Sequence, residues 1–296
     1  MTSASESANL YQQIQQFYDA TSGLWEQVWG EHMHHGYYGP TGTHQKERRQ
    51  AQIDLIEAVL TWGDVTQAKQ ILDVGCGIGG STLYLAEKYT AQAVGITLSP
   101  VQAKRAAARS QSAGFSLDPN QPEKSPQATF QVANALDTPF DDNQFDFIWS
   151  MESGEHMPDK EQFLRECYQL LQPGGIFLMA TWCHRPTNTL AGGLTADEQA
   201  HLKLIYDLYH LPYVISLPEY GAIARNIGFQ SIRTADWSTA VAPFWNLVID
   251  SAINPGVIAG ILQAGWPAIT GSFALHLMNT GFSRGLVRYG LLCATK

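Results

Sequence analysis

Glu152, Glu155 and His156 bring two carboxylates and an imidazole together near the middle of the chain. The apolar run Phe145–Met151 precedes them and predicts a buried strand, so these side chains should lie just beyond its carboxyl end. A carboxylate can orient a neighbouring imidazole, which then accepts a proton, so the pattern indicates general acid–base chemistry. The alternative interpretation is structural: the two glutamates cap the following helix and His156 only packs.

A glycine-rich turn, Asp73–Gly79, follows the short apolar run that begins at Ile71 and opens an amphipathic segment, Ser81–Tyr89. The apolar run predicts a buried parallel strand, and the amphipathic segment predicts a helix that packs on the sheet. Glycines at such a turn allow a ligand to approach bare backbone, and the N-terminus of the helix offers unpaired N–H donors. The sequence therefore predicts a nucleotide-like ligand at the carboxyl edge of the first strand.

The end of the second strand bears on the identity of that ligand. Gly75, Gly77 and Gly80 satisfy G-x-G-x-x-G, but a dinucleotide site also expects an acid about 20 residues further on, beside a ribose hydroxyl. The second strand, Gln92–Leu98, ends without an acid. An Asp inside the strand before the glycines resembles instead motif I of the class I S-adenosylmethionine-dependent methyltransferases, and Gly95–Gln102 resembles a variant found in small-molecule methyltransferases. A nicotinamide or flavin enzyme and a degenerate fold without a cofactor are the alternatives.

Strand-like and helix-like patterns alternate along the rest of the chain, which predicts an α/β fold with a seven-stranded, mostly parallel, doubly wound sheet. After the first two strands, the expected strands are Thr129–Ala133, Phe145–Met151, Ile176–Trp182, Ser231–Trp237 and Leu286–Thr295. The expected helices are Lys46–Trp62, Ser81–Tyr89, Pro100–Gly114, Lys160–Leu171 and Leu217–Gly228. Ligands of such sheets bind beyond the carboxyl ends of the strands.

Three segments fall outside this frame, and we expect them to decorate a single Rossmann-like domain that spans residues 1–296. Residues 10–62 form an N-terminal helical arm, and residues 184–216 and 238–284 are two inserts expected to act as helical lids. Between Asp250 and Arg284 the second insert has no charged residue, although glycines and prolines interrupt it. A membrane-spanning helix, ordinary lid packing, and a lid over an oily substrate or a membrane surface are the alternatives.

The composition excludes several classes of protein. The chain is 45% hydrophobic and 15% charged, which is typical of a well-filled globular core. A net charge of -9 without a cluster of basic residues argues against a nucleic-acid partner. The four cysteines are scattered without metal-ligand spacing, so we expect no metal, and reduced thiols in a cytoplasm-like compartment. Residues 1–10 have the pattern of neither a signal nor a transit peptide.

Longer motifs give a more specific resemblance, to the tocopherol C-methyltransferase family. They are Phe17–Trp25, Trp29–Gly39, Arg48–Gln52, Glu152–Pro158, Ala180–Pro186, Leu194–Glu198 and Thr234–Ser238. The resemblance runs from Leu10 to the C-terminus and includes both inserts. It departs in the proline-rich loop Pro119–Pro126, which is longer than in the family, and at Asn279–Ser283, which is less basic.

The resemblance implies methyl transfer from S-adenosylmethionine to the ring carbon ortho to the phenol of γ-tocopherol, which gives α-tocopherol. Because the family includes relatives that methylate nitrogen in indole alkaloids, an indole-type amine is the alternative acceptor; a non-catalytic protein that binds the cofactor or a lipid surface is another. The expected cofactor-binding residues are Asp73, Gly75, Cys76, Gly77, Gly79, Thr97, Leu98, Gln102, Asn134, Ala135, Met151, Tyr18 and Tyr37. We expect Tyr38, Trp182 and His184 to bind a lipophilic aromatic acceptor, and His156, oriented by Glu155 or Glu152, to act as the base. The oligomeric state stays open.

Overall fold

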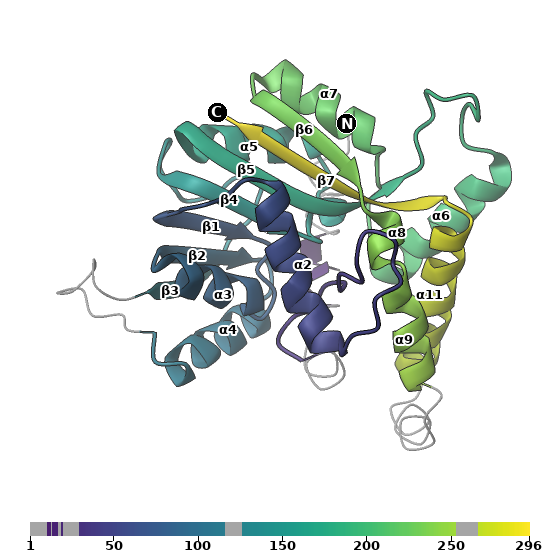
Figure 1. Cartoon of the computed structure of the whole chain (residues 1–296), viewed down its shortest axis with the longest axis horizontal. Coiled ribbons are helices and arrows are strands. Elements are labelled where there is room, and N and C mark those ends of the chain that lie inside the picture. The colour runs from purple at the N-terminus through teal and green to yellow at the C-terminus, as the bar shows by residue number, and fades with distance from the viewer. Residues whose placement is uncertain (1–10, 13, 17–18, 20–29, 116–125, 253–265) are drawn as a thin grey trace.

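The computed structural model of this chain describes residues 11–12, 14–16, 19, 30–115, 126–252 and 266–296. Their centre is a seven-stranded sheet in the order β3-β2-β1-β4-β5-β7-β6 (Figure 1). In this sheet β7 runs antiparallel to its neighbours β5 and β6, and the remaining pairs are parallel, as predicted. The strands are β1 (Gln70–Val74), β2 (Gln92–Thr97), β3 (Gln127–Val132), β4 (Phe145–Met151), β5 (Leu171–His184), β6 (Gln230–Asp236) and β7 (Val287–Thr295).

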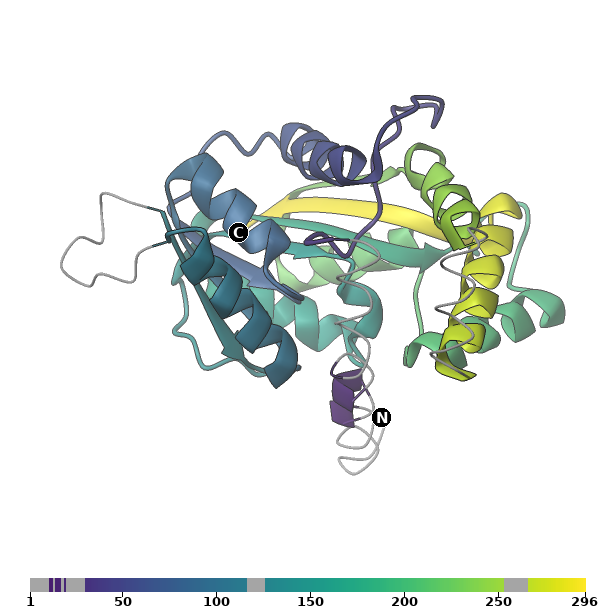
Figure 2. The same cartoon turned by 90° about the horizontal axis from the view of Figure 1, so that it is seen from below.

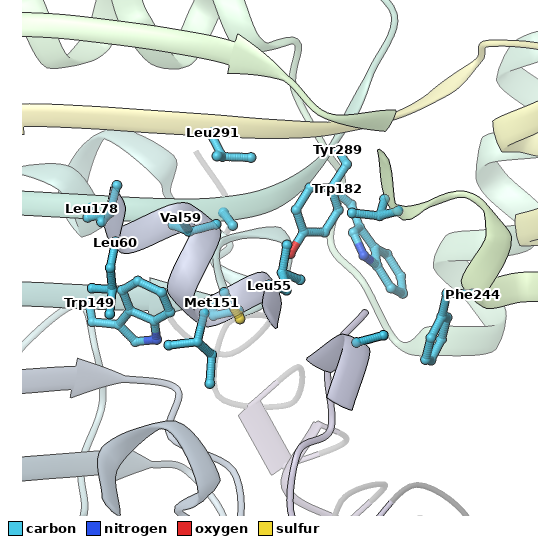
Figure 3. Close-up of a cluster of buried hydrophobic side chains, with 14 of the residues drawn as sticks. Leu55, Val59, Leu60, Trp149, Met151, Leu178, Trp182, Phe244, Tyr289 and Leu291 are labelled. Atoms are coloured by element: carbon cyan, nitrogen blue, oxygen red, sulfur yellow. The ribbon is translucent and has the colours of Figure 1, made fainter. Parts of the chain in front are cut away.

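Helices cover both faces of the sheet, which confirms the doubly wound fold. They include α2 (Arg48–Trp62), α3 (Gly80–Tyr89), α4 (Pro100–Ser112), α5 (Lys160–Leu170) and α7 (Leu217–Ile227). Successive strand residues point to opposite faces, so Ile71 packs with the core under α2 and α3, whereas Leu72 packs with the core under α5 and α7. Figure 3 shows the first of these cores, where Leu55 and Val59 of α2 lie close to side chains of the sheet.

Among the element boundaries that differ from the prediction, two have clear local reasons. The helix expected from Lys46 begins at Arg48, because the side chain of Glu47 accepts hydrogen bonds from the backbone N–H groups of Arg49 and Gln50 and so caps the helix. The strand expected from Ile176 begins at Leu171, because Leu171 already pairs with Phe145 of β4, and the register shifts before Ile176 pairs with Phe147. Most of the predicted N-terminal arm helix lies outside the described residues.

The two inserts leave the same edge of the sheet and pack together. The first follows β5 and contains α6 (Ala196–Tyr209); the second follows β6 and contains α8 (Ser238–Val241), α9 (Pro243–Ala252) and α11 (Trp266–Ser283). Helix α11 contacts both α6 and α9, and the three stand side by side beyond the end of the sheet (Figures 1 and 2). None of the helices in the described parts of the chain has the length and apolar character needed to cross a membrane.

Candidate active site

A cavity opens at the carboxyl edge of the sheet, where the loops after β1, β2, β3 and β4 meet the inserts and the loop before α2. Strands that are far apart in the sequence end side by side there, which is the position expected for a ligand of an open α/β sheet. Of the residues predicted from the sequence, the cavity lining includes Asp73, Gly75, Cys76, Gly77, Thr97, Leu98, Gln102, Asn134, Ala135, Met151, Glu152, Glu155, His156 and Trp182.

The glycine turn after β1 has backbone conformations that favour glycine. Gly75 has φ +81°, and a Cβ there would lie 2.2 Å from Cβ of Ser153, so the turn packs tightly against the loop after β4. Gly77 has φ +53°, and the nearest atom to a Cβ there would be Sδ of Met33 at 4.0 Å. Packing therefore requires a glycine at position 75, whereas the space beside Gly77 is part of the cavity.

Polar groups around this turn fit a ligand with adenosine-like hydrogen-bonding groups. Asp73 is buried and accepts a 2.6 Å hydrogen bond from Oγ1 of Thr82; burial raises the pKa of Asp73 to about 7 although that bond lowers it. Oγ1 of Thr97 donates to Oε1 of Gln102 at 2.7 Å, which fixes the amide beside the cavity. Oδ1 of Asn134 accepts a 3.1 Å hydrogen bond from the backbone N–H of Leu136, so this residue forms an Asx turn and also lines the cavity.

Glu152 holds a buried hydrogen-bond network at the end of β4. Its Oε1 accepts from the backbone N–H of His35 at 2.8 Å and from the hydroxyl of Tyr289 at 2.9 Å, and its Oε2 lies 2.8 Å from Nδ1 of His35. Burial by itself would raise the pKa of Glu152, but the charge and hydrogen bonds of His35 outweigh it, and the pKa lies below its ordinary value. Glu152 is therefore an ionised carboxylate paired with a histidine.

The neighbouring polar groups differ in charge state because burial dominates their pKa values. Oε2 of Glu155 accepts from Thr181 at 2.7 Å, and burial, with repulsion from the adjacent carboxylate, raises the pKa of Glu155 to about 8. Burial, assisted by the charge of Lys160, lowers the pKa of His156 to about 3. At neutral pH Glu155 is therefore mostly protonated and His156 neutral. The cap of α5 is Asp159, so neither glutamate serves as that cap.

Aromatic rings form the other end of the cavity. The ring of His35 lies 4.7 Å from Phe244 and 4.9 Å from Trp245 between centroids, and Trp182 packs edge-on to Tyr209 at 5.4 Å. Apart from His35, these rings come from β5, α6 and α9, so the two inserts supply most of this wall. Figure 3 shows Trp182 beside Tyr289, with which it pairs across β5 and β7. This aromatic end is the part of the cavity suited to an apolar ring.

Several residues predicted for the site do not line the cavity. Tyr37 stacks near Trp237 with ring centroids 5.2 Å apart, because its backbone N–H bonds to Ala51 and draws it towards α2. Tyr38 is buried beside α9 in a separate depression, and Nδ1 of His184 bonds to the carbonyl of Arg185. A Cβ on Gly79 would meet the ring of Phe130 at 2.7 Å, so that glycine serves helix packing. Tyr18 lies outside the described residues.

Sequence reasoning also missed residues that do line the cavity. They are Tyr11, Ile14, Met33, His34, His35, Ser81, Tyr209, Phe244 and Trp245. The clustering of three histidines between Glu31 and Gly39 is the available signal for part of this set. Within the described part of the chain, the histidines, cysteines and acids form no group of three or more that could hold a metal ion.

Comparisons with known proteins agree with the class that the fold and cavity define. Residues 72–179 match the family model of a methyltransferase domain. A crystal structure of a putative sarcosine dimethylglycine methyltransferase from Galdieria sulphuraria has a TM-score of 0.77 and 25% identity, covering 94% of this chain and 98% of its own. The protein is an enzyme of the class I methyltransferase type.

Two plant relatives narrow the class to a family. The probable chloroplastic tocopherol O-methyltransferase of Oryza sativa subsp. japonica is 45% identical, over 94% of this chain and 76% of its own. The chloroplastic tocopherol O-methyltransferase of Arabidopsis thaliana is 43% identical, over 96% and 81% respectively. The chain belongs to the tocopherol methyltransferase family.

Proposed function

We propose that this enzyme transfers the methyl group of S-adenosylmethionine to the ring carbon ortho to the phenol of a tocopherol-type chromanol, converting γ-tocopherol to α-tocopherol. The observation that carries the proposal is the lining of the cavity, which passes from the polar glycine turn to an aromatic chamber. The names of the plant relatives describe enzymes that act on tocopherol.

The glycine-turn end would hold the methyl donor. Gly77 leaves room for the ligand, and Asp73, Thr97, Gln102 and Asn134 supply hydrogen-bonding groups around it. When bound, S-adenosylmethionine supplies an electrophilic methyl group with a positive sulfonium. The charge of the sulfonium disappears as the methyl group is transferred, so an enclosed site of low polarity favours the reaction.

The aromatic end would hold the chromanol ring. Trp182, Tyr209, Phe244 and Trp245 offer flat apolar surfaces, and most of them come from the inserts. Acting as lids, these inserts would exclude water and align the ring carbon with the methyl group. Reactants aligned in this way gain effective molarities of about 10⁵–10⁸ M.

The phenol must also lose its proton before its ring carbon becomes a strong nucleophile. With a Tyr-like pKa of about 10, that step costs about 4 kcal/mol at pH 7. His156, predicted as the base, is neutral but binds a proton weakly, because burial holds its pKa at about 3. We assign His156 and protonated Glu155 to positioning the chromanol, with Glu155 as a hydrogen-bond donor to its phenol oxygen.

Product analysis tests this function. The enzyme is incubated with methyl-labelled S-adenosylmethionine and γ-tocopherol, and the product is identified by mass spectrometry and chromatography against α-tocopherol and the methyl ether of γ-tocopherol. We expect α-tocopherol. The methyl ether would refute carbon methylation, and transfer to an indole amine but to no chromanol would refute the substrate class.

The lipophilic acceptor also suggests where the enzyme works. Residues between Asp250 and Arg284 carry no charge, so this part of the second insert would suit contact with the membrane surface from which a chromanol is drawn. We expect the enzyme to float with lipid vesicles, and full recovery in the vesicle-free fraction would contradict this contact. The cytoplasm-like compartment expected from the cysteines stays a prediction.

A further inference from the structure

His35 is a buried histidine of the cavity wall that sequence reasoning assigned to no role. It lies on the loop that precedes α2, with 1% of its surface exposed. Its Nδ1 faces the carboxylate of Glu152 at 2.8 Å, and the rings of Phe244, Trp245 and Phe282 surround it. Its Nε2 is buried and has no hydrogen-bond partner among the described residues. A buried imidazole nitrogen that has no hydrogen-bond partner within an aromatic wall indicates that a ligand binds there.

The carboxylate behind His35 determines what the imidazole can do. Since Glu152 is ionised, Nδ1 carries the hydrogen and donates it, so neutral His35 has its lone pair on Nε2. A carboxylate in this position also stabilises the imidazolium that forms when Nε2 takes a proton. Glu152 is itself fixed by Tyr289 and by the backbone N–H of His35, which limits its movement.

Burial lowers the pKa of two other histidines of the cavity. Nδ1 of His34 donates to the carbonyl of His35 at 2.8 Å, and burial lowers the pKa of His34. The pKa of His156 is about 3, also chiefly through burial. The titratable groups that face His35 are Glu152, Tyr289 and His34, and burial raises the pKa of Tyr289 so that its phenol stays neutral. The ring of His35, by contrast, is hydrogen-bonded to an ionised carboxylate.

We propose that Nε2 of His35, oriented by Glu152, accepts the phenolic proton of the chromanol; this role rests on the proposed function. The phenolic O–H bond breaks, and its proton forms an imidazolium against Glu152. The ortho ring carbon bonds to the methyl carbon of the donor while the carbon–sulfur bond breaks, leaving its electron pair on sulfur. The ring carbon then loses its hydrogen as a proton to water, and the restored phenolate takes its proton back from His35. Glu152 is a positioning residue.

Varying the acidity of the phenol distinguishes a residue that accepts the proton from a residue with only a structural role. His35→Ala and Glu152→Gln are compared with the wild-type enzyme on γ-tocopherol and on a fluorinated chromanol whose phenol is more acidic. For γ-tocopherol we expect kcat of His35→Ala to fall about 10²–10⁴-fold with an unchanged Kd for S-adenosylmethionine. For the acidic phenol the loss should shrink by about tenfold or more, because a weaker base suffices.

The matched control is His34→Ala, which removes the neighbouring cavity histidine that has no carboxylate behind it. Its loss of rate should be the same for both phenols. Equal losses on both phenols for His35→Ala and Glu152→Gln would overturn the proposal. If His35→Ala fails to bind S-adenosylmethionine and so is misfolded, the nearly isosteric Glu152→Gln decides alone. A wild-type enzyme that methylates neither chromanol would instead refute the proposed function.

Discussion

Replacing Gly75 by alanine should destabilise the fold, because the site turn is packed against the loop after β4. At φ +81° an alanine costs about 1–2 kcal/mol in backbone strain. Its Cβ would lie 2.2 Å from Cβ of Ser153, and moving that residue adds about 1–3 kcal/mol of overpacking. Ser153 cannot move freely, because its hydroxyl donates to the carbonyl of Val74 at 2.6 Å. We therefore expect Gly75→Ala to lose about 2–5 kcal/mol of unfolding free energy.

Gly77→Ala is the matched variant, two residues further along the same turn. Its backbone strain is similar at φ +53°, but its Cβ meets no atom closer than Sδ of Met33 at 4.0 Å, so the loss of stability should stop at about 1–2 kcal/mol. The added methyl group enters the space assigned to the donor and should weaken S-adenosylmethionine binding by about tenfold or more. Urea unfolding and titration calorimetry measure the two effects. Equal destabilisation of both variants, or wild-type donor affinity in Gly77→Ala, would refute this account of the turn.

Three further variants test other parts of the site. Because the folded-state pKa of Glu155 is raised to about 8, its protonation stabilises the fold fully below about pH 4.5, and this contribution is lost as the pH rises through 8. Glu155→Gln should therefore gain stability relative to the wild type between pH 5 and pH 9 in urea unfolding, and a constant difference would contradict the assignment. Trp245→Ala should lower kcat/KM for the chromanol at least tenfold, because the ring of Trp245 lies at the aromatic end of the cavity. Calorimetry should give an unchanged Kd for S-adenosylmethionine. A raised Kd would argue against separate donor and acceptor ends of the cavity. Tyr37→Leu should leave donor affinity unchanged because Tyr37 packs against Trp237, and a marked loss of affinity would return this residue to the site.

The order of strands and helices was predictable because it depends on local patterns. The strand β4 has the predicted bounds, Phe145–Met151, because its apolar run is bounded by polar residues on both sides. The helix α2 and the strand β5 differ at their first residues because a side-chain cap and a bulge decide those ends. Neither feature has a period that a hydrophobic pattern could reveal.

The polar half of the cavity was predictable for a similar reason. Residues at the carboxyl ends of parallel strands must meet, so Asp73, Thr97 and Asn134 could be brought together without knowing the structure. The aromatic half depends on tertiary contacts. His35 and Glu152 are 117 positions apart, and no local pattern indicates that pairing. Tyr37 was predicted among the cofactor-binding residues, but the hydrogen bond of its backbone N–H to Ala51 directs it elsewhere.

The loop before α2 links the two halves of the cavity. A Cβ on Gly80 would lie 2.3 Å from the carbonyl oxygen of Glu31, so the first turn of α3 lets this loop approach closely. Nε2 of Gln52 then donates to the carbonyls of His32 and His34 at 2.6 and 2.9 Å, which fixes the loop to α2. The same short segment therefore covers the glycine turn and carries His35 into the aromatic chamber. Since one rigid loop contacts both ends, the position of the proposed base is set by the same packing that shapes the donor site.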